Sequence, residues 1–164
     1  MRVYGIIGWQ NSGKTTLVEI LVREITSRGF TVSTVKHAHH DVDLDRPGKD
    51  THRHRQAGAQ EVILASGKRM FIMVEHRVEE PSLQQVLSRL APVDLVLIEG
   101  YKRDDHAKIE VWREATGQPL IQTDDPSVRA VASDAALTLS VPLLDLNDPA
   151  SIADFILSEV GLVA

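Results

Sequence analysis

The stretch Val3-Tyr4-Gly5-Ile6-Ile7-Gly8-Trp9-Gln10-Asn11-Ser12-Gly13-Lys14-Thr15 decides the fold. Its first part is a short apolar run, typical of a buried strand. Its second part, Gly8–Thr15, matches the phosphate-binding pattern G-x-x-x-x-G-K-[ST] without a mismatch. An apolar stripe with helical spacing follows within Leu17–Ile25. Strand, glycine-rich loop and helix in this order predict a nucleoside triphosphate site, and a chance glycine-rich turn before a helix is the alternative.

The residue types in this loop fit phosphate chemistry. Gly8 and Gly13 let the backbone turn its N–H groups inward, and the first turn of the helix adds unsatisfied N–H groups and a positive dipole end. Lys14 is expected to reach the β- and γ-phosphates, and the Thr15 hydroxyl is expected to ligate Mg²⁺. The other loop residues expected at the nucleotide are Asn11, Ser12 and Thr16.

The bulk composition is that of an ordinary globular protein. A chain of 164 residues, 43% hydrophobic and 25% charged, predicts a single domain over residues 1–164. No run approaches the roughly 18 apolar residues of a membrane span. The N-terminus enters the first strand directly, which leaves no room for a signal peptide, so a cytoplasmic location is expected. The absence of Cys excludes disulfides and thiolate metal sites.

The charge distribution argues against general nucleic-acid binding. The net charge is −5 and the pI is near 5.8. A basic stretch nevertheless lies within Arg46–Arg55, and such a stretch in an acidic protein suits a compact anionic ligand. A solvated helix face without a ligand is the alternative, and charge alone does not separate the two.

Helices and strands alternate along the chain, which predicts an α/β fold of the three-layer P-loop NTPase type with a mostly parallel sheet flanked by helices. The expected strands are Val3–Ile7, Thr31–Lys36, Glu61–Ala65, Met70–Val74, Leu95–Ile98, Ile109–Trp112, Val128–Ala132 and Leu143–Leu144. The expected helices after the first, which Gly29 closes, are Asp50–Ala57, one opened by the Ser82 capping box and ending near Leu90, and one opened by Asp148-Pro149 and ending near Val160.

The second half of a nucleotide site is expected at the end of another buried strand. In Asp94-Leu95-Val96-Leu97-Ile98-Glu99-Gly100, the acid at the carboxyl end is Glu99. Ligands gather at this edge of a parallel sheet, so Glu99 is expected to hold Mg²⁺ or orient a water. A strand-end acid that only meets solvent is the alternative. Asp94 begins the run at the opposite edge and is expected to be structural.

The segment His37-Ala38-His39-His40-Asp41-Val42-Asp43-Leu44-Asp45 is rich in potential metal ligands. Neither its His spacing nor its Asp alternation matches zinc or calcium loop signatures. A polar loop that contacts the ligand is the favoured interpretation, with Asp45 assisting Mg²⁺.

Base recognition has no clear signature, because the N-K-x-D pattern used by many guanine-specific proteins is absent. Thr123-Asp124-Asp125 and Ser133-Asp134 each offer a carboxylate for the guanine N–H groups, and Asp134 is taken as the base-contacting candidate. A turn or a helix cap is the favoured alternative for each.

Several segments taken together resemble the MobB family of molybdopterin-guanine dinucleotide biosynthesis adapter proteins. The resemblance is carried by Gly8–Thr15, by Lys36-His37-x-His39-His40 with Asp43 and Asp45, by Pro47–Arg53, by Ala57-Gly58-Ala59, by Glu99-Gly100-Tyr101-Lys102 and by Asp145–Pro149. It extends over essentially the whole chain. The part from Lys36 to Ala59 is far more specific than the phosphate loop, which many unrelated proteins share.

The resemblance implies binding of GTP and Mg²⁺, slow intrinsic hydrolysis and a homodimer. It also implies a helper role beside a MobA-type guanylyltransferase that attaches GMP to molybdopterin. On this reading, His37, Lys49 and Asp50 belong to the segment that faces the nucleotide, the pterin phosphate or the partner enzyme. Lys14 and Glu99 are then the catalytic residues, and Arg53 is the internal candidate for an arginine finger.

Two other functions use the same loop. A small-molecule kinase would need an acceptor pocket and a base, which the Asp41–Asp45 segment can offer. A metal-delivery GTPase is suggested because five of the seven His residues fall between His37 and His54.

Overall fold

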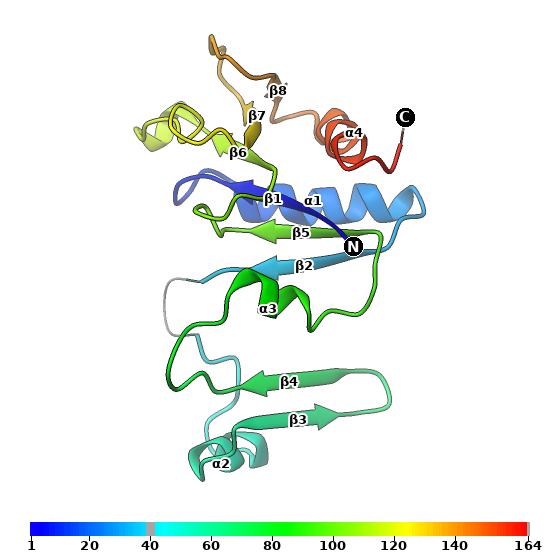
Figure 1. Cartoon of the computed structure of the whole chain (residues 1–164), viewed down its shortest axis with the longest axis vertical. Helices are drawn as coiled ribbons and strands as arrows, with labels where there is room; N and C mark the ends of the chain where they lie inside the picture. Colours follow the sequence, from blue (N-terminus) through cyan, green and yellow to red (C-terminus); the bar gives the residue numbers. More distant parts are fainter. Residues whose placement is uncertain (39–41, 164) are drawn as a thin grey trace. The chain divides into compact units, whose positions relative to one another are not determined.

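The computed structural model describes residues 1–38 and 42–163. The chain divides into two compact units, the first made of Met1–His37 with Arg89–Ala164 and the second of Ala38–Ser88. Figure 1 shows their elements in chain order. The predicted single domain stays a prediction.

A parallel sheet forms the centre of the first unit. In the described part of the chain it has six strands in the order β2-β5-β1-β6-β7-β8, and every neighbouring pair is parallel. The predicted α/β class with a parallel sheet flanked by helices is therefore confirmed. The strands are β1 (Arg2–Ile7), β2 (Val32–Lys36), β5 (Leu95–Glu99), β6 (Lys108–Trp112), β7 (Val128–Ser133) and β8 (Leu143–Asp145).

One face of this sheet packs on helices. Alternate strand residues such as Tyr4 and Leu97 join one buried apolar cluster with α1 (Lys14–Ser27) and α4 (Pro149–Glu159). The two helices contact each other along this face. Fully buried apolar residues from both strands and helices therefore hold β1, and with it the start of α1, in a fixed place.

Loops pack on the other face of the sheet, where two buried charges hold them. The Lys108 ammonium donates to the carbonyl oxygens of Lys102 (3.2 Å) and Asp104, and pairs with Asp125 at 3.3 Å. The Glu110 carboxylate accepts backbone N–H groups of Ile121 and Gln122, each at 2.9 Å. Burial raises the pKa of Glu110, and the two N–H donors oppose this shift. Buried polar groups with partners thus hold these loops on the sheet.

The expected caps form. Asp148 accepts the Ser151 N–H at the start of α4, and Ser82 and Gln85 form the predicted capping box of α3 (Leu83–Leu87). Gly29 follows α1 with a positive φ of 91°. None of the helices in residues 1–38 and 42–163 has the length and apolar character that a membrane span requires.

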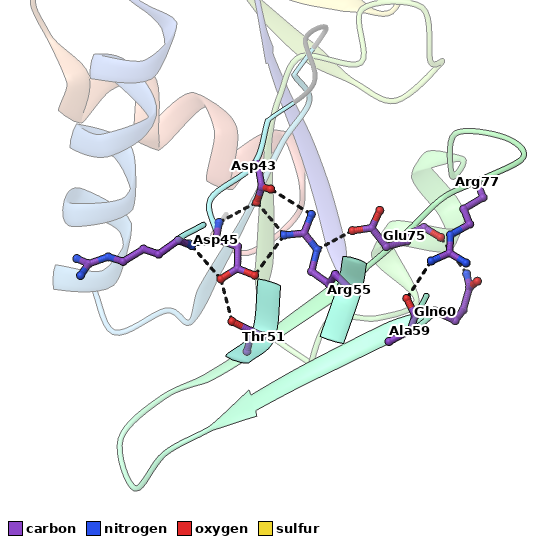
Figure 2. A network of polar contacts seen from close by, with 9 residues as sticks. Asp43, Asp45, Thr51, Arg55, Ala59, Gln60, Glu75 and Arg77 are labelled. Carbon is purple, nitrogen blue, oxygen red and sulfur yellow. Dashed lines mark hydrogen bonds and ion pairs between the residues drawn. The ribbon is translucent and has the colours of Figure 1, made fainter. Parts of the chain in front are cut away.

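The second unit holds α2 (Asp50–Gln56), α3 and an antiparallel hairpin of β3 (Glu61–Ala65) and β4 (Met70–Val74). Figure 2 shows Arg55 of α2 between three acids from two segments, the loop before α2 and the residue after β4. Its guanidinium contacts Asp43 at 2.8 Å, Asp45 at 3.3 Å and Glu75 at 2.6 Å. Arg55 therefore ties the loop before α2 to the residue after β4.

Candidate nucleotide-binding site

The carboxyl ends of the parallel strands bring five chain segments to one edge of the sheet. Because β1 lies between β5 and β6, the loop after β1 is flanked by the residues that follow those two strands. In strand order, the residues at this edge are Lys36 and His37, Glu99, the glycine loop (Gly8–Thr15), Arg113, and Asp134.

The glycine loop has the backbone conformation that its glycines permit. Gly8 has a φ of 145°, and a Cβ there would lie 2.3 Å from the Val111 carbonyl oxygen. Gly13, which precedes α1, has a φ of 96°, and Asn11 has a φ of 64°. These left-handed positions turn the chain sharply before the helix begins, which is the backbone shape that cradles phosphates in such loops.

Two polar side chains of the loop, Lys14 and Ser12, differ in whether they have a hydrogen-bond partner. Lys14 donates its ammonium to the Trp9 carbonyl oxygen at 2.6 Å, so it folds back over the loop. Burial lowers the pKa of Lys14, the Glu99 carboxylate opposes the shift, and the positive charges of Lys102 and Lys36 add to it. The Ser12 hydroxyl is buried and has no hydrogen-bond partner among the described residues. Two polar groups inside the loop are thus suited to an anionic ligand.

Thr15 and Glu99 meet as the sequence predicts. The Thr15 hydroxyl donates to Glu99 Oε1 at 2.7 Å, and the Lys36 ammonium lies 3.1 Å from the same carboxylate oxygen. Glu99 is only 9% exposed, whereas Thr15 is exposed at the start of α1. A hydroxyl and a carboxylate oxygen are ligands that Mg²⁺ prefers, and a cationic group already contacts both. The residues present therefore fit Mg²⁺.

Arg113, which sequence reasoning missed, connects the glycine loop with Asp134. Its Nε donates to the Ser12 carbonyl oxygen at 3.2 Å, and its Nη1 forms a close ion pair with Asp134. Arg113 follows directly after β6, which pairs with β1. Glu99 was predicted because ligands gather at the carboxyl ends of the strands next to the loop. The same rule would also have indicated Arg113.

Aromatic side chains line the same edge. The Trp9 indole N–H donates to the Pro119 carbonyl oxygen at 2.7 Å, and the Lys102 ammonium lies 4.3 Å from the centre of the Trp9 ring. The ring of His37, a predicted nucleotide contact, stacks on Tyr101 with 4.3 Å between centroids. His37 is therefore at the predicted edge, and Trp9 adds a fluorescent side chain within the loop.

Four other predicted site residues belong to the second unit. Lys49, Asp50 and Arg53 are exposed at the start of α2 and on it. The carboxylate of Asp45 accepts from the Thr51 hydroxyl at 2.8 Å and from the Arg46 N–H at 2.9 Å, besides its contact with Arg55. The nucleotide roles of these residues stay predictions.

The His-rich segment is described only in part. His39, His40 and Asp41 lie outside the described residues. Within the described part, no group of three or more potential ligands is placed to hold a metal ion. Of the remaining loop residues, Asn11 and Thr16 are exposed beside Ser12 and Thr15, as a ligand contact requires.

The sheet order and the loop define a class: an α/β protein whose first strand and first helix are joined by a glycine-rich loop facing a strand-end acid. Residues 3–134 match the family MobB, molybdopterin guanine dinucleotide synthesis protein B. The chain belongs to this family of molybdopterin-guanine dinucleotide biosynthesis adapter proteins.

Curated relatives and solved structures agree with this assignment. The molybdopterin-guanine dinucleotide biosynthesis adapter protein of Escherichia coli K12 is 43% identical over 152 residues, covering 90% of this chain and 87% of the relative. The protein of the same name from Haemophilus influenzae is 42% identical over 154 residues, with 93% and 85% covered. The crystal structure of a MobB homologue from Bacillus stearothermophilus matches with a TM-score of 0.73 and 27% identity, covering 99% of this chain and 100% of that one.

Proposed function

We propose that this chain binds GTP with Mg²⁺ at the glycine loop, hydrolyses it slowly and acts as an adapter beside a MobA-type guanylyltransferase. The observation that carries the proposal is the 2.7 Å hydrogen bond between Thr15 and Glu99. It joins the two residues that a metal-dependent triphosphate site needs, from segments 84 positions apart in the sequence. A chance glycine-rich turn gives no reason for this pairing.

The proposed roles follow from the positions of the side chains. The loop N–H groups and the first turn of α1 bind the phosphates, and the Lys14 ammonium leaves the Trp9 carbonyl to reach them. Thr15 and Glu99 hold Mg²⁺, which neutralises charge on the phosphate oxygens when bound. Glu99 also orients the attacking water, since its carboxylate is fixed beside the loop.

Asp134 is the proposed contact to the guanine base. It follows β7, two strands away from β1, so it lies at the same sheet edge beyond the phosphate loop. Its carboxylate is held by Arg113 in the structure. A carboxylate at this place can accept the guanine N–H groups, which adenine does not offer in the same pattern.

The adapter role rests on the family and on the names of its relatives, which are biosynthesis adapters for molybdopterin-guanine dinucleotide. Lys49 and Arg53 supply the basic surface of the second unit for molybdopterin phosphate or for the guanylyltransferase. Both side chains are exposed, as such contacts require.

A homodimer is proposed through the β3–β4 hairpin. Its large apolar side chains are half exposed, among them Ile63 (54%), Met70 (64%) and Phe71 (53%). A two-stranded sheet is marginally stable alone, and an exposed apolar patch of this kind marks an interaction surface. A second copy of the chain supplies a self-complementary apolar partner.

Nucleotide turnover tests the enzymatic part. The chain with Mg²⁺ is expected to release phosphate from GTP faster than from ATP, without any acceptor molecule. Glu99→Gln is expected to lower this rate by at least about tenfold while GTP affinity changes less, because the orienting carboxylate is lost. Glu19→Gln, an exposed change on α1, is the matched control. Phosphate transfer to an acceptor in place of water would favour the small-molecule kinase instead.

Reconstitution tests the adapter part. With purified guanylyltransferase, molybdopterin and limiting GTP, adding the chain is expected to raise the yield of the dinucleotide cofactor. Arg53→Ala is expected to reduce that gain without changing GTP affinity. An unchanged yield with and without the chain would contradict the adapter role.

A further inference from the structure

The ammonium of Lys36 lies where a cation is expected in the proposed site. It is 3.1 Å from Glu99 Oε1 and 3.3 Å from the Thr15 hydroxyl oxygen, which are themselves 2.7 Å apart. One nitrogen atom thus contacts both residues proposed to hold Mg²⁺. The sequence motifs assign no role to Lys36 of this kind.

The backbone fixes Lys36 in this position. Lys36 is paired with Glu99 in the β2–β5 register, and the His37 N–H donates to the Glu99 carbonyl oxygen at 2.9 Å. A Cβ at Gly100 would lie 2.9 Å from the Cβ of His37, so the two strand ends approach closely. The placement of Lys36 opposite Glu99 is therefore a property of the sheet.

The side chain of Lys36 is nevertheless free to leave. Lys36 is 59% exposed, whereas the Glu99 side chain is 11% exposed. The carboxylate is fixed and largely removed from water, and the ammonium approaches it from solvent. Because the ammonium stays in contact with water, a divalent cation can replace it at the carboxylate.

We propose that Lys36 is the resident cation of the magnesium site: it neutralises Glu99 and holds the Thr15 hydroxyl until Mg²⁺ enters, and Mg²⁺ must displace it. The inference rests on the proposed function. Lys36 makes the affinity for the nucleotide less dependent on Mg²⁺, because its ammonium supplies positive charge when the metal is absent.

The test is a cycle of four affinities measured without turnover. A non-hydrolysable GTP analogue is titrated into the wild type and into Lys36→Met, each with Mg²⁺ and with EDTA, and the intrinsic fluorescence of Trp9 and Trp112 is recorded. Lys36→Met is expected to increase the ratio of the two dissociation constants, EDTA over Mg²⁺, by at least about threefold. Lys36→Arg, which keeps the charge, is expected to restore a ratio near that of the wild type, and Lys68→Met, in the exposed hairpin turn, is the matched control.

The outcomes separate the two proposals. If wild type and Lys36→Met bind the analogue with the same ratio, the role of Lys36 is wrong and the nucleotide site stands. If the folded wild type does not bind the analogue under either condition, the proposed function fails, and the role of Lys36 fails with it.

Discussion

Arg113 connects three parts of the site through one guanidinium group. It holds the Ser12 carbonyl of the glycine loop, pairs with Asp134 and follows the strand next to β1. An arginine so placed restrains the loop from the side on which the proposed base contact lies. We expect it to position the glycine loop for the proposed ligand.

Arg113→Ala is therefore expected to weaken binding of a GTP analogue by about tenfold, the value of one charge-assisted hydrogen bond. The loss should appear mainly in a faster dissociation rate, because the loop is less restrained when the ligand is bound. Arg23→Ala, on the exposed face of α1, is the control. Stopped-flow measurements that show equal dissociation rates for both variants would contradict this role.

At this scale the sequence was enough to predict only some of the side chains that come together in the candidate site. The loop motif and the strand-end acid were enough to pair Thr15 with Glu99, because both depend on local patterns read along one strand each. Arg113 and Lys36 carry no motif, and their roles arise from which strands become neighbours. The roles of Arg113 and Lys36 therefore cannot be predicted from a single sequence unless the order of the strands is known.

At the scale of the elements, β1 contains a glycine, Gly5, that lies within the strand and not in a turn. A Cβ at Gly5 would lie 2.5 Å from His106 Nε2 and 2.8 Å from the Cβ of Lys108. His106 lies just before β6, and Lys108 is the β6 residue paired with Gly5. Glycine at this position lets that segment lie close to the strand.

Gly5→Ala is expected to lower the free energy of unfolding by about 1–3 kcal/mol, because the added methyl overpacks a filled space. Gly67→Ala is the matched control, since nothing lies within 4 Å of a Cβ at that position in the turn between β3 and β4. Chemical denaturation measures the difference, and equal midpoints for both variants would be inconsistent with the close packing.

The starts of β2 and β5 are joined by a titratable group. The Asp94 carboxylate accepts both the N–H and the hydroxyl of Thr31, at 2.8 and 2.7 Å, and these bonds lower the pKa of Asp94. A carboxylate whose pKa is lower in the folded state contributes stability above its unfolded pKa, about 3.9, and loses it as the pH falls through the folded value.

The free energy of unfolding should therefore decrease as the pH falls below about 4, and Asp94→Asn should decrease less over that range. Asp105→Asn, an exposed change, should follow the wild-type profile. Parallel profiles for Asp94→Asn and the wild type would show that the Thr31 contact contributes nothing to stability.

Most elements could be predicted because their signals are local. The two hairpin strands have the predicted bounds, and the other strands and the helix starts lie close to theirs, since apolar runs, caps and glycines act within a few residues. The buried charges Lys108 and Glu110 were not foreseen as such. Their burial depends on carbonyl and N–H groups of irregular loops, 4 to 12 residues away in the sequence, which no residue pattern reveals.

For the molecule as a whole, the open question is what covers the apolar side chains of the hairpin. Val78 is an even more exposed apolar residue, at 97%, but it lies outside the hairpin. Replacing an exposed apolar residue inside the hairpin and one outside it, Val78, therefore tests whether the proposed dimer forms through the hairpin.

The wild type is expected to sediment as a dimer at micromolar concentration, and Phe71→Ser is expected to weaken the dimer by about a hundredfold, because each copy loses an aromatic ring that the proposed dimer buries. Val78→Ser is expected to remain dimeric. A monomeric wild type, or equal dissociation of both variants, would move the interface away from the hairpin.

The most direct measurement of the central claim is calorimetric titration of a non-hydrolysable GTP analogue with Mg²⁺ into the wild type and into Lys14→Ala. The account predicts saturable binding by the wild type, a loss of at least about a hundredfold in Lys14→Ala, and an unchanged circular dichroism spectrum, since Lys14 contacts the loop and lies outside the apolar core. A folded Lys14→Ala variant that binds the analogue as tightly as the wild type would contradict it.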